Sequence, residues 1–116
     1  MTIATAISQA DALRDNVIDA SQKAEWVIAL DTEIAEVLNE TPEPLSYPAD
    51  ADSELLMLFP FDDVYVKYLI AQIDYYNMES SLYANDMVVY NNRMAEAKAW
   101  LRRHNHKPTF RYWRTF

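Results

Sequence analysis

The longest helical pattern in the chain covers residues 61–103, where no Pro or Gly interrupts the sequence. In its second half, apolar side chains recur every three or four residues, which is typical of one helix face: Tyr83, Met87, Tyr90, Met94, Ala97 and Leu101. Its first half carries two adjoining stripes: Val66, Ile70, Ile73 and Asn77, and Tyr65, Leu69, Gln72 and Tyr76. A helix that is apolar on adjoining faces is usually buried. We therefore predict that this segment is the centre of the fold.

This long segment contains one candidate break, at residues 77–81. Ser80 or Ser81 can cap a second helix there, although one long kinked helix is the alternative. The first half begins near Asp62 or Asp63, whose carboxylates suit the positive end of a helix dipole. The second half ends near His104, after basic residues that suit the negative end of the dipole: Lys98, Arg102 and Arg103.

Two shorter helices are predicted before it. The first begins at Thr2 or Thr5 and ends near Asp15, with a narrow apolar stripe: Ile3, Ile7, Ala10, Leu13 and Val17. The second begins near Asp19 or Ser21 and ends near Asn39. Its inner face holds four apolar residues, with Trp26 beside them: Val27, Leu30, Ile34 and Val37. Its acidic residues are expected to face solvent: Asp31, Glu33, Glu36 and Glu40.

Residues 41–60 have three Pro in their first eight positions and no helical period, so they predict a loop. Residues 54–59 form a short apolar run that suits a short strand or an extended strap over the helices. One or two short edge strands are compatible with this pattern. The expected fold is all-α: a bundle-like domain of four to five helices, residues 1–106, with a long Pro-containing loop.

The last ten residues, 107–116, predict an extended C-terminal arm, because Pro108 cannot continue the helix. Basic and aromatic side chains alternate along it: Phe110, Arg111, Tyr112, Trp113, Arg114 and Phe116. This much aromatic surface is costly to leave in water, so the arm should pack on its own domain or add to a neighbouring protein. Both alternatives stay open.

Charge is spread unevenly along the 116 residues, which carry a formal net charge of −8. Residues 1–54 sum to −10, residues 55–97 to −4, and residues 98–116 to +6. An acidic body with a basic end indicates two surfaces for different partners. Copies of such a chain would also attract one another head to tail.

Two residue types that many active sites require are missing from the sequence. It has no Cys, which excludes disulfides and thiolate sites, and no Gly, on which phosphate loops and nucleophile elbows depend. The two histidines, His104 and His106, lie in no metal-binding motif. We expect neither an enzyme nor a cofactor or metal site, and no residue predicts a hydrolase. Without a signal peptide or a run of membrane-spanning length, we expect an intracellular, soluble protein.

Residues 55–103 resemble a family of small head–tail connector proteins, also called adaptor or head-completion proteins, of tailed phages and prophages in Gram-positive hosts. The shared pattern reads L-L-x-L-x-P-[FY]-D-D-V-Y-V-x-Y-L-x-A-x-I-D-Y-Y-N-x-E, followed by Y-N-N-x-M-A-x-A. The resemblance covers about half of the chain, and the matching positions are Pro60, Asp62, Asp63, Val64, Tyr65, Tyr68, Leu69, Ile73, Asp74, Tyr75, Asn77, Glu79, Tyr90, Asn91, Asn92 and Met94. The family often has Gly where this chain has Met78. The arm after Asn105 is not part of the pattern.

The resemblance implies an all-helical structural protein of the virion neck, assembled in the host cytoplasm. Many copies would form a ring, expected to be a dodecamer, beneath the portal protein at the capsid vertex. Further neck or tail proteins would dock on the ring, and viral DNA would pass through it without specific binding. No membrane is involved.

We place the contacts with the portal or with neighbouring subunits in the loop of residues 41–59, at the end of the last helix, and in the arm. The candidate interface residues are Leu45, Tyr47, Leu56, Phe59, Arg103, Phe110, Arg111, Tyr112, Trp113, Arg114 and Phe116. The alternative function is a small acidic helical binding module, such as a regulator or antitoxin-like partner, that masks a basic surface.

Overall fold

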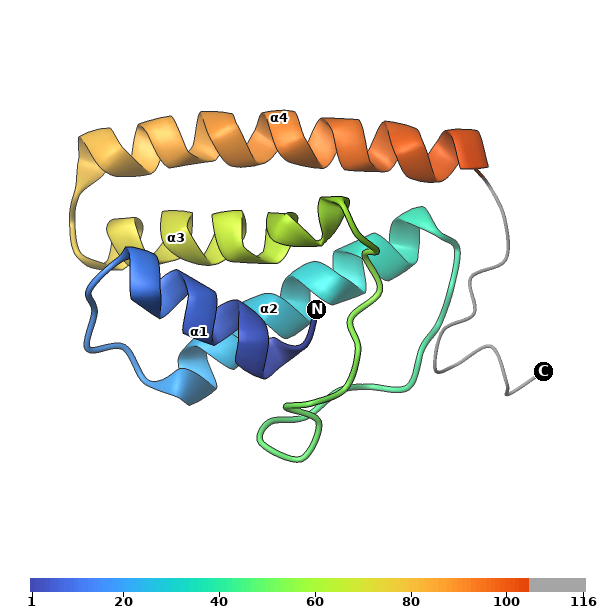
Figure 1. Ribbon diagram of the computed structural model, residues 1–116, viewed down its shortest axis with the longest axis horizontal. Helices are drawn as coiled ribbons and strands as arrows, with labels where there is room; N and C mark the ends of the chain where they lie inside the picture. The colour runs from blue at the N-terminus through green and yellow to red at the C-terminus, as the bar shows by residue number, and fades with distance from the viewer. Residues whose placement is uncertain (105–116) are drawn as a thin grey trace.

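The computed structural model describes residues 1–104, which form four α-helices and one short 3₁₀ turn (Figure 1). In chain order these are α1 (Ile3–Leu13), α2 (Ala20–Val37), η1 (Phe61–Asp63), α3 (Val64–Tyr76) and α4 (Ser80–His104). The all-α prediction is confirmed. The predicted boundary between residues 106 and 107 lies outside the described residues.

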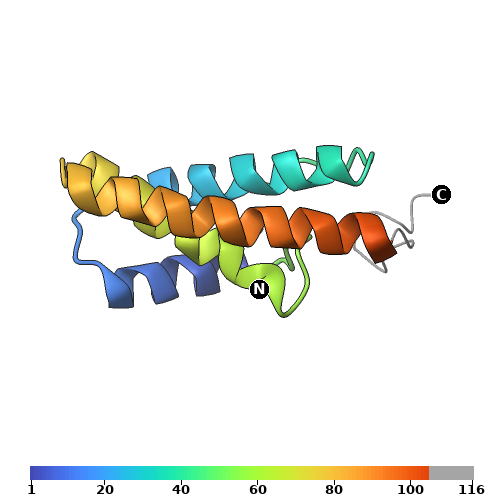
Figure 2. The ribbon, with the colours of Figure 1, turned by 90° about the horizontal axis from the view of Figure 1, so that it is seen from above.

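Helix α3 is the central element, as the hydrophobic pattern predicts. It lies antiparallel to α4 on one side and packs against α1 and α2 on the other (Figures 1 and 2). Its buried side chains come from adjoining faces, which is why neighbours are needed on both sides: Val64, Tyr65, Val66, Leu69, Ala71, Ile73 and Asp74. Four residues of the apolar seam of α4 are buried with them: Tyr90, Met94, Ala97 and Leu101.

The break between α3 and α4 is a tight corner, so the single kinked helix is ruled out. Asn77 ends α3, and Met78 has a φ of 60°, in the left-handed region. The N–H of Glu79 then donates to the carbonyl of Asp74 at 2.9 Å, which closes the corner. This conformation costs a residue other than Gly about 1 kcal/mol. Helix α4 begins at Ser80, so neither predicted serine precedes it as a cap.

The other helices begin where the sequence predicts, but the predicted capping hydrogen bonds do not all form. The hydroxyl of Thr2 accepts from the N–H of Thr5 at 3.1 Å, so the predicted cap of α1 is confirmed. Asp19 and Asp63 stand immediately before α2 and α3, yet neither makes a side-chain capping hydrogen bond. Asp63 thus occupies the predicted N-cap position of α3, but its carboxylate pairs with Arg93 at 3.0 Å and does not cap the helix.

Residues 38–60 form an extended strap over the helices. Its residues Leu55, Leu56 and Met57 are buried in the core, and the N–H of Leu55 donates to the carbonyl of Met1 at 2.9 Å. Within residues 1–104, strand-like pairing is limited to a single antiparallel bridge between Thr2 and Glu54. Of the two alternatives for residues 54–59, the structure therefore has the strap, and the described residues contain no edge strand.

One predicted orientation on α2 is wrong. Asp31 was expected to face solvent, but it is only 3% exposed. Its carboxylate accepts from the hydroxyl of Tyr65 at 2.7 Å and from the N–H of Leu56 at 2.9 Å. The Tyr65 hydroxyl in turn accepts from the N–H of Met57 at 2.9 Å. A buried carboxylate is tolerated where hydrogen bonds satisfy it, and here it joins α2, α3 and the strap.

Candidate interaction surfaces

The structure separates the predicted interface residues into three groups. Phe59, 84% exposed, and Arg103, on the last turn of α4, both reach the surface. Leu45 and Tyr47 lie in the strap, half-buried against the core. Leu56 is 1% exposed and belongs to the core, so its assignment to an interface is wrong. The predicted arm residues lie outside the described residues: Phe110, Arg111, Tyr112, Trp113, Arg114 and Phe116.

An exposed apolar surface lies where the strap enters α3. Leu58 and Phe59, which we call the strap-end patch, are both exposed. Ionic contacts fix the backbone beneath them. Arg93 of α4 pairs with Asp63 and donates to the carbonyl of Pro60 at 2.9 Å, and its guanidinium lies 4.5 Å from the centre of the Phe61 ring. The patch therefore stands on a rigid base.

A second exposed apolar surface lies at the α3–α4 corner. Its four residues, which we call the corner patch, are all exposed: Tyr75, Tyr76, Met78 and Leu82. Met78 is the extreme case at 89% exposed. An open hollow of about 520 Å³ lies among the corner residues, and the rings of Tyr75 and Tyr83 meet there at 5.1 Å. Sequence reasoning counted Tyr76 toward a core stripe and treated Met78 only as a departure from the family pattern.

A buried charge cluster holds this corner to α1. The guanidinium of Arg14, just after α1, lies 3.1 Å from Asp74 of α3 and 3.7 Å from Asp86 of α4. Both carboxylates are buried, and Asp86 Oδ2 has no hydrogen-bond partner within the described chain. Burial, together with the negative charge of Asp74, raises the pKa of Asp86 to about 6, against the lowering effect of Arg14. The protonated form of Asp86 is therefore favoured relative to that of an exposed aspartate.

Sequence reasoning did not assign this cluster. Asp74 stands in the family pattern, but Asp86 occupies an unremarkable polar position beside the apolar seam of α4. Arg14 lies in a segment expected only to end the first helix. The sequence carried one signal for this cluster. The packed faces of α3 and α4 are expected to be buried, and a buried carboxylate needs a partner.

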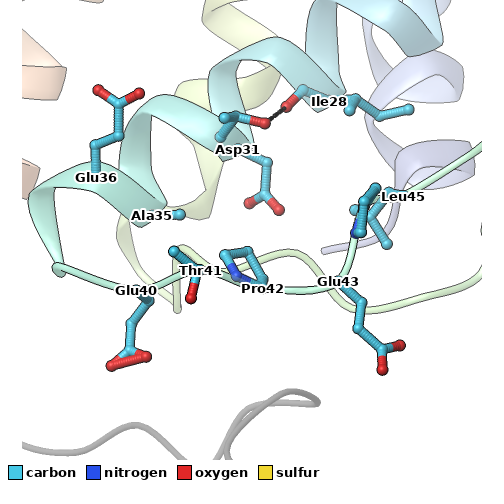
Figure 3. A pocket seen from close by; sticks show the side chains of 11 residues that line it. Ile28, Asp31, Ala35, Glu36, Glu40, Thr41, Pro42, Glu43 and Leu45 are labelled. Carbon is cyan, nitrogen blue, oxygen red and sulfur yellow. Dashed lines mark hydrogen bonds between the residues drawn. The ribbon is translucent and has the colours of Figure 1, made fainter.

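A groove runs between α2 and the start of the strap, with a volume of about 410 Å³ (Figure 3). Its apolar lining comes from both elements: Ile28, Ala35, Pro42, Pro44 and Leu45. Glu36, Glu40 and Glu43 stand around its rim, and in Figure 3 their carboxylates point away from the apolar lining. Thr32, also in the lining, donates its hydroxyl proton to the carbonyl of Ile28 at 2.9 Å, so it is satisfied within its helix.

Within residues 1–104, no three His, Asp or Glu side chains come together in a way that could hold a metal ion. No helix of the same residues combines the length and the apolar character needed to cross a membrane.

Comparison with known proteins identifies no relative: no protein-family model, no curated protein and no solved structure matches this chain.

Proposed function

We propose that the protein is a head–tail connector of a tailed phage or prophage, which forms a ring beneath the portal protein and docks further neck or tail proteins. The observation that carries this proposal is the pair of exposed apolar patches at opposite ends of α3. The strap-end patch precedes its first turn and the corner patch follows its last. Its 13 residues put roughly 20 Å between them.

Two different patches at opposite ends favour a head-to-tail interface. In such a contact, the strap-end patch of one copy meets the corner patch of the next, and neither patch meets itself. Heterologous contacts of this kind close into rings when the rotation between copies permits. Exposed apolar side chains that gather at two sites also mark interaction surfaces more often than scattered ones do.

The residues of the family pattern support the proposal through their positions. Asp63 anchors the start of α3 beneath the strap-end patch through Arg93, and Asp74 anchors its end beneath the corner patch through Arg14. The pattern thus coincides with the groups that hold both candidate contact surfaces in shape. That is expected where a motif serves assembly and carries no catalytic group.

The acidic surface of α2 fits a channel through which DNA passes. Exposed carboxylates recur along this helix, at Glu25, Glu33 and Glu36. If they line the channel, like-charge repulsion keeps the phosphate backbone from sticking to the wall. The protein would reach this position in the virion neck after assembly in the host cytoplasm.

The acid-rimmed groove on α2 favours a second candidate function, a small acidic binding module. Glu36, Glu40 and Glu43 around an apolar lining suit a basic, partly apolar partner segment. A regulator or antitoxin-like protein would use such a face to mask a basic surface.

Native mass spectrometry of the protein, alone and mixed with the portal protein of the same genome, tests the connector function. Loading of about one copy per portal subunit is the expected result. Phe59→Asp and Met78→Asp each place a charge in one apolar patch and should abolish ring closure. Val88→Asp changes an exposed apolar residue of α4 outside both patches and serves as the matched control.

A monomer or dimer that ignores the portal would overturn the connector function and favour the binding module. If the portal loads normally but both patch variants also load normally, the connector function stands and the assignment of the two patches is wrong.

A further inference from the structure

The groove between α2 and the strap is an apolar surface that the described residues leave uncovered. Five aliphatic or proline side chains line it beside Asp31, Thr32 and Thr41, and its rim carries Glu36, Glu40 and Glu43. No ion pair within the described residues neutralises these three carboxylates. An occupant that fits this groove is apolar or aromatic along its centre and basic at its edges.

The end of the described chain lies close enough for the chain itself to supply that occupant. Helices α2 and α4 both end on the same side of the molecule, as two perpendicular views show (Figures 1 and 2). The groove begins on the last turns of α2. Twelve residues follow His104 in the sequence, and fully extended they span up to about 40 Å.

The sequence of this segment matches the groove in chemistry. Between residues 107 and 116 it carries three basic and four aromatic residues: Lys107, Arg111 and Arg114, and Phe110, Tyr112, Trp113 and Phe116. We propose that residues 107–116 dock in the groove of their own chain, with aromatic rings against the proline and aliphatic lining. The two arginines pair with the rim glutamates, where a guanidinium can bind a carboxylate through two parallel hydrogen bonds.

Docking within the chain is favoured over docking on a neighbour because the segment is tethered. A short linker gives an effective concentration in the millimolar range, far above the concentration of a second chain in dilute solution. The inference goes beyond the connector function and does not depend on it. In a connector, the docked arm would be unavailable to the portal until a partner competes for it.

The absence of Cys makes a direct test straightforward, because one introduced thiol is unique in the chain. Thr115→Cys in the full-length protein carries a nitroxide spin label, and ¹⁵N amide spectra are recorded with the label oxidised and reduced. The expected result is loss of intensity for the amides of Thr32, Ala35 and Leu45 in the oxidised state. Glu36→Lys should restore those signals, as should salt near 1 M, where the screening length falls to about 3 Å.

Glu25→Lys is the matched control, since it makes the same charge change on an exposed position of α2 outside the groove and should leave the broadening in place. Mixing spin-labelled ¹⁴N protein with unlabelled ¹⁵N protein distinguishes docking of an arm on its own chain from docking on a neighbouring chain. Broadening in the mixed sample alone would overturn docking within the chain and assign the groove to a neighbour's arm. No broadening in either sample would overturn the proposal outright. Neither result bears on portal loading, which is measured separately.

Discussion

Replacing the buried Asp86 by Asn should stabilise the protein near neutral pH. Asp86 is 8% exposed, Asp74 opposes it, and the Arg14 guanidinium is shared between the two carboxylates. Its pKa is raised from 3.8 to about 6, chiefly by burial. A carboxyl group with a raised pKa in the folded state contributes stability that is fully present below pH 3.8 and is lost as the pH rises through 6.

The size of the effect follows from that pKa difference. At about 1.36 kcal/mol for each pH unit, the ionised Asp86 costs about 3 kcal/mol relative to the protonated form. Asn mimics the protonated acid and can donate a hydrogen bond to Asp74. We therefore expect Asp86→Asn to raise the free energy of unfolding at pH 8 by about 2–3 kcal/mol. Between pH 8 and pH 5 the wild type should recover about 1 kcal/mol of that difference, because its Asp86 becomes protonated.

Urea unfolding, followed by far-ultraviolet circular dichroism at pH 5, 6, 7 and 8, measures both quantities. The difference between variant and wild type isolates Asp86 from the other carboxyl groups. Asp52→Asn removes an exposed carboxylate of the strap and serves as the matched control. An Asp86→Asn variant that is less stable than the wild type at pH 8, or a difference that stays constant from pH 5 to pH 8, would refute the reasoning.

Four further substitutions test the packing by urea or thermal unfolding. Met78→Gly should stabilise the protein by about 1 kcal/mol, because Gly adopts the left-handed conformation without strain; a loss of stability would contradict the corner geometry. Tyr65→Phe should cost about 1–3 kcal/mol, since it leaves Asp31 and the N–H of Met57 short of a partner; an unchanged midpoint would show that the network contributes nothing. Leu56→Ala should cost about 2–5 kcal/mol, while Phe59→Ala should stay within about 0.5 kcal/mol. Equal costs would contradict their assignment to core and surface.

The helices were predictable because their apolar residues repeat over many turns. Helix α3 needs neighbours on adjoining faces, and its central position follows from that alone. For the corner between α3 and α4, the position was predictable but the backbone conformation was not. Asn77 and the serines marked a break, but the left-handed residue is Met78, which carries no side-chain signal for that conformation.

Asp31 and Leu56 show what the pattern could not reveal. An acidic residue on a helix usually faces water, and nothing local indicates that a strap 25 residues later brings a backbone N–H to its carboxylate. Leu56 lies in an apolar run too short to have a period, so its direction was undetermined. The corner patch was missed for a related reason, because tyrosines at helical spacing are equally compatible with core positions and with surface positions.

The hydrogen bonds of Asp31 have a consequence for the order in which the chain folds. Its carboxylate accepts from groups on two later segments, Leu56 and Tyr65, the second of them 34 residues further along the chain. As the chain leaves the ribosome, α2 is complete before either donor exists. Packing α2 at that stage would strip water from a charge with nothing to replace it. Burial of the ionised Asp31 carboxylate is therefore favourable only once the strap and α3 supply their donors, so the native contacts of these three segments depend on one another.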